Sequence, residues 1–158
     1  MSTREKAGML QKDDITLRKA DEKDAYILSL MDKECLAAEC WSENVFSENL
    51  KREDALTLIA ECNGTVAGFI NVSVVFPEAD INTVAVLPDY RRKGIADILL
   101  SGIFSELSDI EDFHLEVRES NIPAISLYRK NGFEEDGIRK NFYSSPSENA
   151  ILMTKRKK

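Results

Sequence analysis

A short basic turn between an apolar run and a helical run constrains this chain more than any other segment. Residues 81–87 are mostly apolar and end before Pro88, which is typical of a strand. Residues 89–96 read Asp-Tyr-Arg-Arg-Lys-Gly-Ile-Ala, and apolar residues then recur at helical spacing to about residue 107. The first N–H groups of a helix lack internal partners and carry partial positive charge. Because Gly94 lets the backbone come close to a ligand, the turn is suited to bind a pyrophosphate.

The turn differs from the common nucleotide-binding loops, since it contains neither G-x-G-x-x-G nor G-x-x-x-x-G-K-[ST]. The 158 residues carry a net charge of −7, which argues against general binding of nucleic acid and favours basic partners. The length fits a single domain. We expect this domain over residues 13–155, preceded by a flexible polar tail over residues 1–12.

Cysteine and histidine usage argues against a metal centre. Cys35, Cys40 and Cys62 have no histidine or further cysteine at ligand spacing, and His114 is the sole histidine. An odd number of cysteines without a signal segment predicts reduced thiols. No apolar run reaches the ~18 residues expected of a membrane span. We therefore expect a cytoplasmic protein that has no metal and no membrane anchor.

Hydrophobic periodicity predicts an α/β fold. Asp21 and Ser42 are expected to cap two helices, and Asn63-Gly64 is expected to join two strands in a hairpin. The predicted strands are residues 15–20, 55–62, 65–76, 79–87, 113–118, a segment from residue 133 onward, and 150–154. The predicted helices are residues 22–36, 43–50, 94–107 and 122–130. The order β-α-α-β-β-β-α-β-α-β-β indicates a mixed sheet with helices on its faces.

Several spaced motifs extend the pattern from residue 15 to residue 154. They are Trp41-Ser42, Arg91-x-x-Gly94-x-Ala96, Leu115-Glu116-Val117-Arg118, Ser120-Asn121, Ala124-Ile125, Leu127-Tyr128, Gly132-Phe133, Ile138-Arg139 and Phe142-Tyr143. Together they resemble the GCN5-related N-acetyltransferase (GNAT) family, and within it the RimI-like branch that acetylates the alanine N-terminus of a ribosomal protein. The chain departs from that branch at Cys40, where the branch has proline, and at Phe142, where it has tyrosine.

The resemblance implies a fold, a co-substrate and a set of binding residues. The sheet would be largely antiparallel and twisted, with a central parallel pair that splays apart to hold acetyl-CoA. Its pantetheine arm would lie along the backbone of Val84, Ala85 and Val86, with Asn121 and Tyr128 also on the cofactor side. The acceptor would enter past Trp41, Arg139 and Tyr143. The pyrophosphate would rest on Arg91, Arg92, Lys93, Gly94, Ile95 and Ala96.

Glu116 and Tyr128 are the predicted catalytic pair. Alternation along residues 113–118 points Glu116 away from the apolar side chains. If that face lines the cleft, its carboxylate takes the amine proton directly or through a water. The alternative is a solvated carboxylate or an ion pair with Arg118. Tyr128 would donate a proton to the departing thiolate, and the alternative is a core tyrosine. For Asn121, a helix N-cap is an equal alternative to cofactor binding.

The ionisation of amines favours a protein N-terminus as the acceptor. A peptide α-amine has a pKa of about 7.7–8.0, whereas a lysine amine at about 10.4 costs roughly 3.4 kcal/mol more to deprotonate. A single carboxylate suits the first task better. The resemblance further implies a basic ribosomal protein as the partner. Two other hypotheses remain: an acetyltransferase for a small-molecule amine, and a CoA-binding sensor without turnover.

Overall fold

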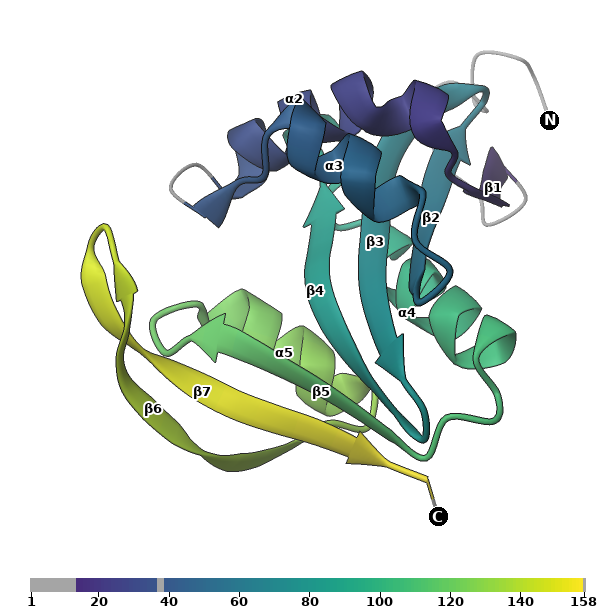
Figure 1. Ribbon diagram of the computed structural model, residues 1–158. Helices are drawn as coiled ribbons and strands as arrows, with labels where there is room; N and C mark the ends of the chain where they lie inside the picture. Colours follow the sequence, from purple (N-terminus) through teal and green to yellow (C-terminus); the bar gives the residue numbers. More distant parts are fainter. Residues whose placement is uncertain (1–13, 37–38, 158) are drawn as a thin grey trace, which may run out of the picture.

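The structure, a computed structural model, describes residues 14–36 and 39–157 (Figure 1). The tail that the sequence predicts over residues 1–12 lies outside these residues. The described elements, in chain order, are β1 (Ile15–Lys19), the 3-10 turn η2 (Glu22–Asp24), α2 (Ala25–Leu36), α3 (Glu43–Leu50), β2 (Ala55–Cys62), β3 (Thr65–Val75), β4 (Glu78–Val86), the 3-10 turn η4 (Pro88–Tyr90), α4 (Ile95–Glu106), β5 (Asp112–Arg118), α5 (Ile122–Lys130), β6 (Glu134–Ser144) and β7 (Ser147–Arg156).

The strands form one sheet that opens in its middle. The described residues make seven strands in the order β1-β2-β3-β4-β5-β7-β6, and all neighbours are antiparallel except β4 and β5. The parallel pairing runs only from Glu78 opposite Asp112 to Asp80 opposite His114. Beyond it the two strands diverge, so that β1–β4 and β5–β7 form two halves of the molecule (Figure 1). The predicted splayed parallel pair is therefore confirmed.

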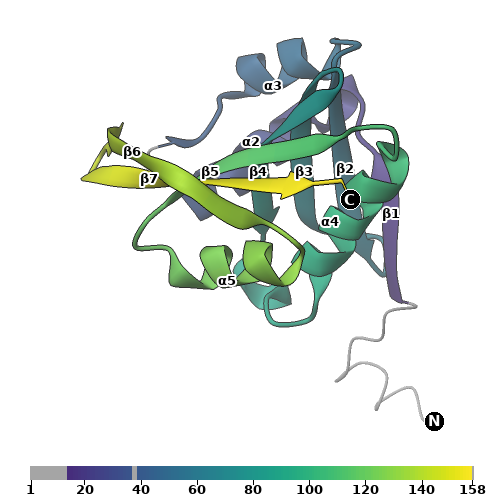
Figure 2. The ribbon, with the colours of Figure 1, turned by 90° about the horizontal axis from the view of Figure 1, so that it is seen from below.

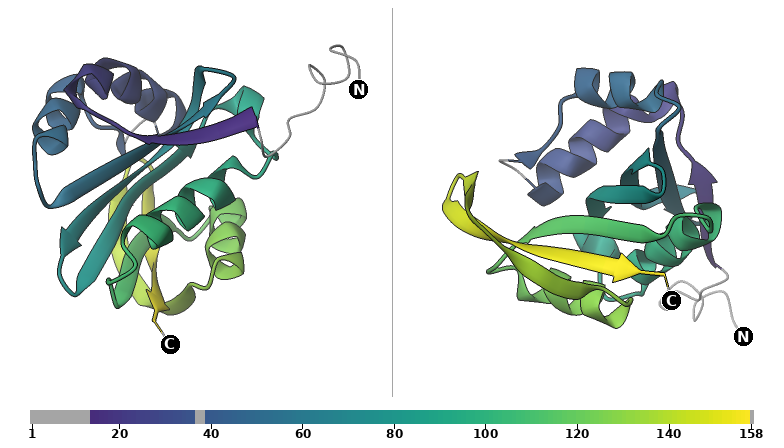
Figure 3. Two further views of the ribbon diagram at one scale, coloured as in Figure 1. Left: turned by 90° about the vertical axis from the view of Figure 1, so that its right-hand side faces the viewer. Right: turned by 60° about the horizontal axis from the view of Figure 1, so that its bottom comes forward.

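The helices cover both faces of the sheet, and each face has its own core. On one face α2 and α3 bury Leu28, Met31 and Phe46 against Phe69 of β3 and Ala85 of β4. On the other face, α4 and α5 lie side by side (Figures 2 and 3). This second core contains apolar residues from both halves of the sheet and from α4 and α5, among them Ile70, Leu99, Leu115, Ile125 and Met153.

Local sequence signals explain where the early elements begin and end. Asp21 forms the capping box with Asp24, and the Ser42 Oγ accepts a hydrogen bond from the N–H of Val45 at 3.3 Å. Asn63 and Gly64 have φ angles of 52° and 83°, the left-handed pair that a two-residue hairpin requires. The predicted element order is confirmed, and the bounds of α3, α5 and β2 match those predicted.

The last strand is longer than the alternation predicted, and the strand before it, for which only a start was predicted, ends at Ser144. β7 runs from Ser147 to Arg156, beyond the predicted 150–154, because it pairs with β5 on one side and β6 on the other. β6 is an edge strand with nearly all its residues exposed, so it has no alternation of apolar residues to detect. No helix in the described ranges has both the length and the apolar character to cross a membrane.

Candidate functional site

A cavity of about 600 Å³ opens where β4 and β5 diverge. Because the pairing of the two strands stops at Asp80, the next residues of both strands face this cavity instead of each other. The cavity lies at the carboxyl side of the splayed pair, where open α/β sheets commonly bind ligands. We call it the cleft. It is lined by Leu36, Glu39, Trp41, Asp80, Ile81, Asn82, Thr83, Val84, His114, Leu115, Glu116, Val117, Arg118, Asn121, Ala124, Tyr128, Phe142 and Tyr143.

Glu116 faces the cleft, as the alternation along its strand predicts. Phe113, Leu115 and Val117 are buried, whereas the Glu116 side chain is 41% exposed and lines the cavity. Its Oε1 lies 3.6 Å from the Nη1 of Arg139, which comes from β6. The carboxylate is thus accessible from the cavity and has a cation beside it, which is an arrangement that a general base for an amine can use.

Tyr128 has features of both roles that the sequence left open, a core tyrosine and a proton donor in the cleft. Only 9% of the residue is exposed, and its ring packs against Phe133 with a centroid distance of 5.7 Å, as a core tyrosine does. It also lines the cleft. Burial, with a smaller contribution from Tyr143, raises the pKa of Tyr128 to about 12. The phenol is therefore fully protonated at neutral pH and is able to donate a hydrogen bond into the cleft.

Tyr143, from β6, lines the cleft together with Phe142. The guanidinium carbon of Arg118 is 4.3 Å from the centroid of its ring. Burial, followed by the carboxylates of Glu116 and Glu39, raises the pKa of Tyr143 to about 12. The ion pair between Glu116 and Arg118 that the sequence left as an alternative is not formed, because Arg118 binds Glu39 and Glu148.

Trp41 lines the cleft from the connection between α2 and α3. Its ring lies 5.2 Å from that of Phe46, and its backbone N–H donates to the Oδ2 of Asp32 at 2.7 Å. Asp32 is fully buried in α2, and burial raises the pKa of its carboxyl group. Asp32 therefore fixes the start of the segment that carries Trp41. A lone aspartate within an apolar helix face was the available sequence signal for this role.

Asn121 has the helix-capping role that the sequence offered as one of two alternatives. Its Oδ1 accepts a hydrogen bond from the N–H of Ala124 at 3.2 Å at the start of α5. The residue also lines the cleft, so a contact with the co-substrate remains a prediction.

The predicted phosphate turn lies outside the lining of the cleft, between β4 and α4. The first residue of α4 follows Gly94, whose φ of 78° is left-handed and which provides no side-chain cap for the helix. Arg92 is also left-handed, with a φ of 63°, and is exposed. The first N–H groups of α4 are thus left without a side-chain acceptor at Gly94, as an anion site requires.

The side chain of Arg91 turns back toward the strand. Its Nε donates to the carbonyl oxygen of Val86 at 2.9 Å, and its Nη2 contacts the Sγ of Cys35 at 3.8 Å. The other predicted cofactor residues differ in their surroundings. Val84 lines the cleft, Ala85 is buried against α2 and α3, Ile95 is buried in the second core, Ala96 is half-buried, and Lys93 is exposed.

An amide network beside the cleft was missed in the sequence. Asn82 is the extra residue of a bulge in β4, since Asn71 pairs with Thr83 and Val72 with Ile81. The Asn82 Nδ2 donates to the Oδ1 of Asn71 at 2.8 Å. A bulge bends its strand and increases the local twist, which helps β4 to leave β5. A polar residue inside an otherwise apolar strand was the signal that could have identified it.

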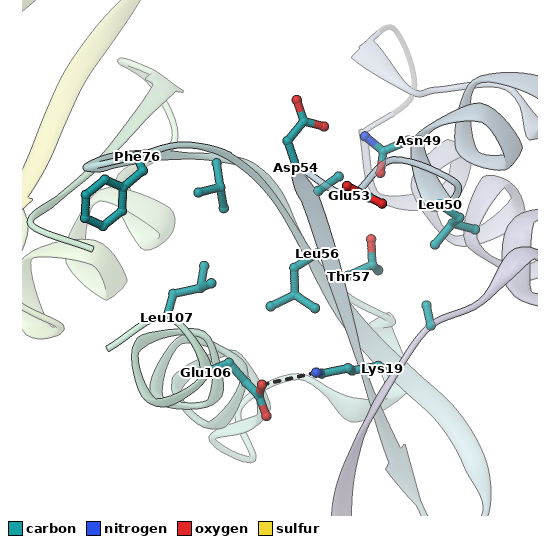
Figure 4. A pocket seen from close by; sticks show the side chains of 13 residues that line it. Lys19, Asn49, Leu50, Glu53, Asp54, Leu56, Thr57, Phe76, Glu106 and Leu107 are labelled. Atoms are coloured by element: carbon teal, nitrogen blue, oxygen red, sulfur yellow. Dashed lines mark ion pairs between the residues drawn. The ribbon is translucent and has the colours of Figure 1, made fainter. Parts of the chain in front are cut away.

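A second, larger cavity of about 690 Å³ contains none of the predicted site residues. It lies between the start of β2 and the end of α4, and Figure 4 shows Glu53, Asp54 and Glu106 at its rim. Lys19, which also lines it, forms an ion pair with Glu106 at 3.4 Å (Figure 4). We do not assign it a function, because it has no group placed for catalysis beside a binding surface.

Three potential metal ligands meet at the start of the parallel pair. The ligand atoms of Glu78, Asp112 and His114 all lie within 4.8 Å of one another. Both ring nitrogens of His114 already have protein partners, with Nδ1 3.0 Å from Thr154 Oγ1 and Nε2 3.1 Å from Glu78 Oε1. We therefore assign no metal to this group, whose three members are brought together only by the pairing of β4 with β5.

Comparisons with known proteins identify the family. The ribosomal protein bS18-alanine N-acetyltransferase of Escherichia coli is 40% identical over 117 residues, which are 72% of this chain and 78% of that protein. An N-alpha-acetyltransferase of Sulfurisphaera tokodaii is 34% identical over 123 residues, covering 68% of this chain and 73% of that protein. The crystal structure of the ribosomal-protein-S18-alanine N-acetyltransferase from Escherichia coli superposes with a TM-score of 0.83 at 34% identity, over 90% of this chain and 93% of that chain.

The predicted resemblance and the predicted fold class are both confirmed by these relatives. The model of the acetyltransferase (GNAT) family matches residues 19–133, which include β4, the basic turn, β5 and α5. Since this match spans most of the chain, the chain belongs to the GNAT acetyltransferase family and is an acetyl-CoA-dependent N-acetyltransferase.

Proposed function

We propose that this enzyme acetylates the N-terminal α-amine of a protein, and that the acceptor is a basic ribosomal protein whose first residue is small, such as alanine. The observation that carries this proposal is that Glu116, Tyr128, Trp41 and Tyr143 line a single cleft. A base, a proton donor and two aromatic walls thus surround one space. The relatives named for alanine N-acetylation of ribosomal protein bS18 support the choice of acceptor.

The described residues suit acetyl-CoA as the co-substrate. The β5-facing edge of β4 beyond Asp80 has no strand partner among the described residues, so its backbone is available to the pantetheine arm. We propose that Val84, Ala85 and Val86 form this contact. Arg91 binds the Val86 carbonyl oxygen, and pairing with β3 uses the backbone groups that face β3. The groups that face the cleft are those available to pantetheine. Asn121 and Tyr128 would contact the thioester end.

The basic turn would bind the pyrophosphate. The N–H groups of Ile95 and Ala96 open α4, where no side chain caps the helix. Arg92 and Lys93 are exposed beside them and would neutralise the phosphates. Gly94 lies between these groups, and the place that a Cβ would take there is open, so the backbone can approach the phosphates.

Glu116 and Tyr128 would move the protons of the reaction. The neutral amine attacks the thioester carbonyl, a C–N bond forms and the C–S bond breaks. Glu116 accepts the proton that the amine nitrogen loses, directly or through a water. Tyr128 donates to the sulfur as the thiolate leaves. Proton exchange with solvent then restores both groups, so that no other reactant is consumed.

The high pKa of Tyr128 refines its role. A phenol of pKa about 12 is a weaker acid than a thiol of pKa ~8.5, by roughly 5 kcal/mol. Complete transfer to the thiolate is therefore uphill. Tyr128 therefore accelerates the reaction mainly by donating a hydrogen bond to the negative charge that develops on sulfur in the transition state. Oxyanion-hole donors act in the same way in acyl transfer.

A peptide that carries both an N-terminal alanine and an internal lysine tests this function. After incubation with acetyl-CoA, mass spectrometry should locate acetyl only on the N-terminal nitrogen, and thiol release should match the acetyl incorporated. Polyamines and peptides with a blocked N-terminus serve as controls. Acetylation of lysine alone, or rapid acetylation of a polyamine with no reaction at the peptide N-terminus, would reject the proposal.

A further inference from the structure

The guanidinium of Arg118, at the end of β5, joins two halves of the molecule across the cleft. Its Nη2 donates to Glu39, which lies in the connection between α2 and α3. Its Nη1 donates to the Glu148 Oε1 at 3.0 Å and to the Pro146 carbonyl oxygen at 2.9 Å, both in the β6–β7 hairpin. The same group covers the ring of Tyr143. The end of this hairpin and residues 39–42 of the α2–α3 connection face each other in two views of the molecule (Figures 1 and 3).

This position is unusual for a surface arginine. Only 18% of the Arg118 side chain is exposed, and it lines the cleft. Charge-assisted hydrogen bonds from arginine to carboxylates are shorter and stronger than neutral hydrogen bonds, and they have a more specific geometry. The planar fork of arginine can bind two carboxylates and a carbonyl oxygen while its face covers an aromatic ring, which the single ammonium of lysine cannot do.

We infer that Arg118 is a positioning residue that sets the width of the acceptor end of the cleft. By binding Glu39 it holds the segment of Trp41, and by covering Tyr143 it holds the opposite wall at a fixed separation. A fixed narrow entrance selects acceptors with a small first residue. This inference rests on the proposed function, because it concerns the route of a peptide N-terminus between Trp41 and Tyr143.

Other contacts secure the hairpin without Arg118, which separates positioning from folding. The backbone N–H of Ser120 donates to the Glu148 Oε2 at 2.6 Å, and β5 pairs with β7 along its whole length. These contacts lie within one half of the molecule. The bridge from Arg118 to Glu39 crosses from one half to the other. Its loss should therefore loosen the entrance while the sheet stays intact.

Three variants test this role. Glu39→Gln removes one carboxylate of the bridge, Arg118→Lys keeps the charge but loses the fork, and Arg118→Met removes the charge while keeping much of the length. Arg129→Met is the matched control, since Arg129 also pairs with a glutamate, Glu135, but lies outside the cleft. The dissociation constant for acetyl-CoA, KM and kcat for peptides that begin with alanine or leucine, and the melting temperature are measured for each.

We expect KM for the alanine peptide to rise about tenfold in Arg118→Met and by a smaller factor in Arg118→Lys and Glu39→Gln. The dissociation constant for acetyl-CoA should stay within about twofold, and the preference for alanine over leucine should fall. In the double variant Glu39→Gln/Arg118→Met, the factor by which KM rises should be smaller than the product of the factors in the two single variants, because both substitutions remove the same bridge. Arg129→Met should behave as the unchanged enzyme.

A second readout does not depend on the acceptor. Trp41 is the sole tryptophan, so its quenching by acrylamide reports on the entrance directly. Quenching should increase in Glu39→Gln and Arg118→Met but not in Arg129→Met. Unchanged quenching together with unchanged peptide KM and selectivity in folded Glu39→Gln and Arg118→Met would overturn the inference. Increased quenching in an enzyme that acetylates no peptide N-terminus would reject the proposed acceptor and keep the bridge.

Discussion

The Nη1 of Arg139 lies 3.6 Å from the Oε1 of Glu116, although β7 separates the strands that carry them. The residue proposed to bind the acceptor and the residue proposed to deprotonate it are therefore neighbours on one face of the sheet. A peptide amine that reaches Glu116 must approach beside this cation. Because a neighbouring positive charge disfavours a protonated amine, it assists the formation of the neutral nucleophile.

Glu116→Gln should lower kcat by ~10²–10⁴, because it removes the base and keeps the shape of the side chain. The dissociation constant for acetyl-CoA should not change. The residual rate should rise with pH as more of the amine becomes neutral. Steady-state kinetics from pH 6 to about pH 9 and calorimetric titration provide these measurements.

Glu119→Gln is the matched control for this variant, since Glu119 lies on the turn after β5 and does not line the cleft. Wild-type turnover in Glu116→Gln at neutral pH would make Glu116 a structural member of the ion pair with Arg139.

Arg139→Gln should raise KM for the peptide by about three- to tenfold while leaving acetyl-CoA binding unchanged. Both partners of the pair with Glu116 are substantially exposed, so the change in the free energy of unfolding should be below ~1 kcal/mol. Thermal unfolding is the control that separates the two effects. A large loss of stability with an unaltered KM would assign Arg139 to the fold instead of the acceptor route.

Tyr128→Phe should slow turnover by roughly 10–10³, since the ring and its packing against Phe133 are kept while the donor to sulfur is lost. The affinity of this variant for the peptide acceptor need not fall. Single-turnover measurements of thiol release at saturating peptide follow this step directly. Equal stability with full activity would reduce Tyr128 to a core residue.

Alkaline conditions should destabilise the protein through Tyr128 and Tyr143. Burial raises the pKa of each from its usual value of about 10 to about 12. Between these values the unfolded chain loses phenolic protons that the folded chain retains, so stability is greatest below pH ~10 and falls as the pH rises toward about 12. Ultraviolet titration of phenolate should lose its late phase in Tyr128→Phe and in Tyr143→Phe. A late phase that persists in both variants would contradict the assigned environments.

Arg92→Asn should weaken acetyl-CoA binding several-fold without loss of stability. Asparagine tolerates the left-handed conformation of this position, with its φ of 63°, better than arginine does. The variant thus removes a charge without straining the turn. Lys51→Asn, at the end of α3, removes the same charge away from the turn. Equal affinity for acetyl-CoA in Arg92→Asn and Lys51→Asn would exclude Arg92 from the phosphate site.

Gly94 is a poor position at which to test phosphate binding by substitution. Its φ of 78° makes any side chain costly there, although a Cβ would meet no atom within 4 Å. Gly94→Val would therefore measure backbone strain together with phosphate binding, since a β-branched residue is least tolerant of that conformation.

The sequence by itself determined the elements, their order and the faces of the strands. Asp21, Ser42 and Asn63-Gly64 act through residues within four positions of themselves, so their roles are readable without tertiary structure. The orientation of Glu116 followed from the period of a strand, because its neighbours Leu115 and Val117 must enter the core. The spaced motifs identified the family for the same reason, since each motif is local.

Only the tertiary structure decided which distant side chains meet. Glu116 binds Arg139 and not Arg118, Arg118 bridges to Glu39, and Asp32 holds the segment of Trp41. These pairs depend on how far β4 and β5 remain paired, on the bulge at Asn82 and on the long β6–β7 hairpin. Strand register and the packing of two cores set those distances together, and no local pattern in the sequence encodes a contact between residues 79 positions apart.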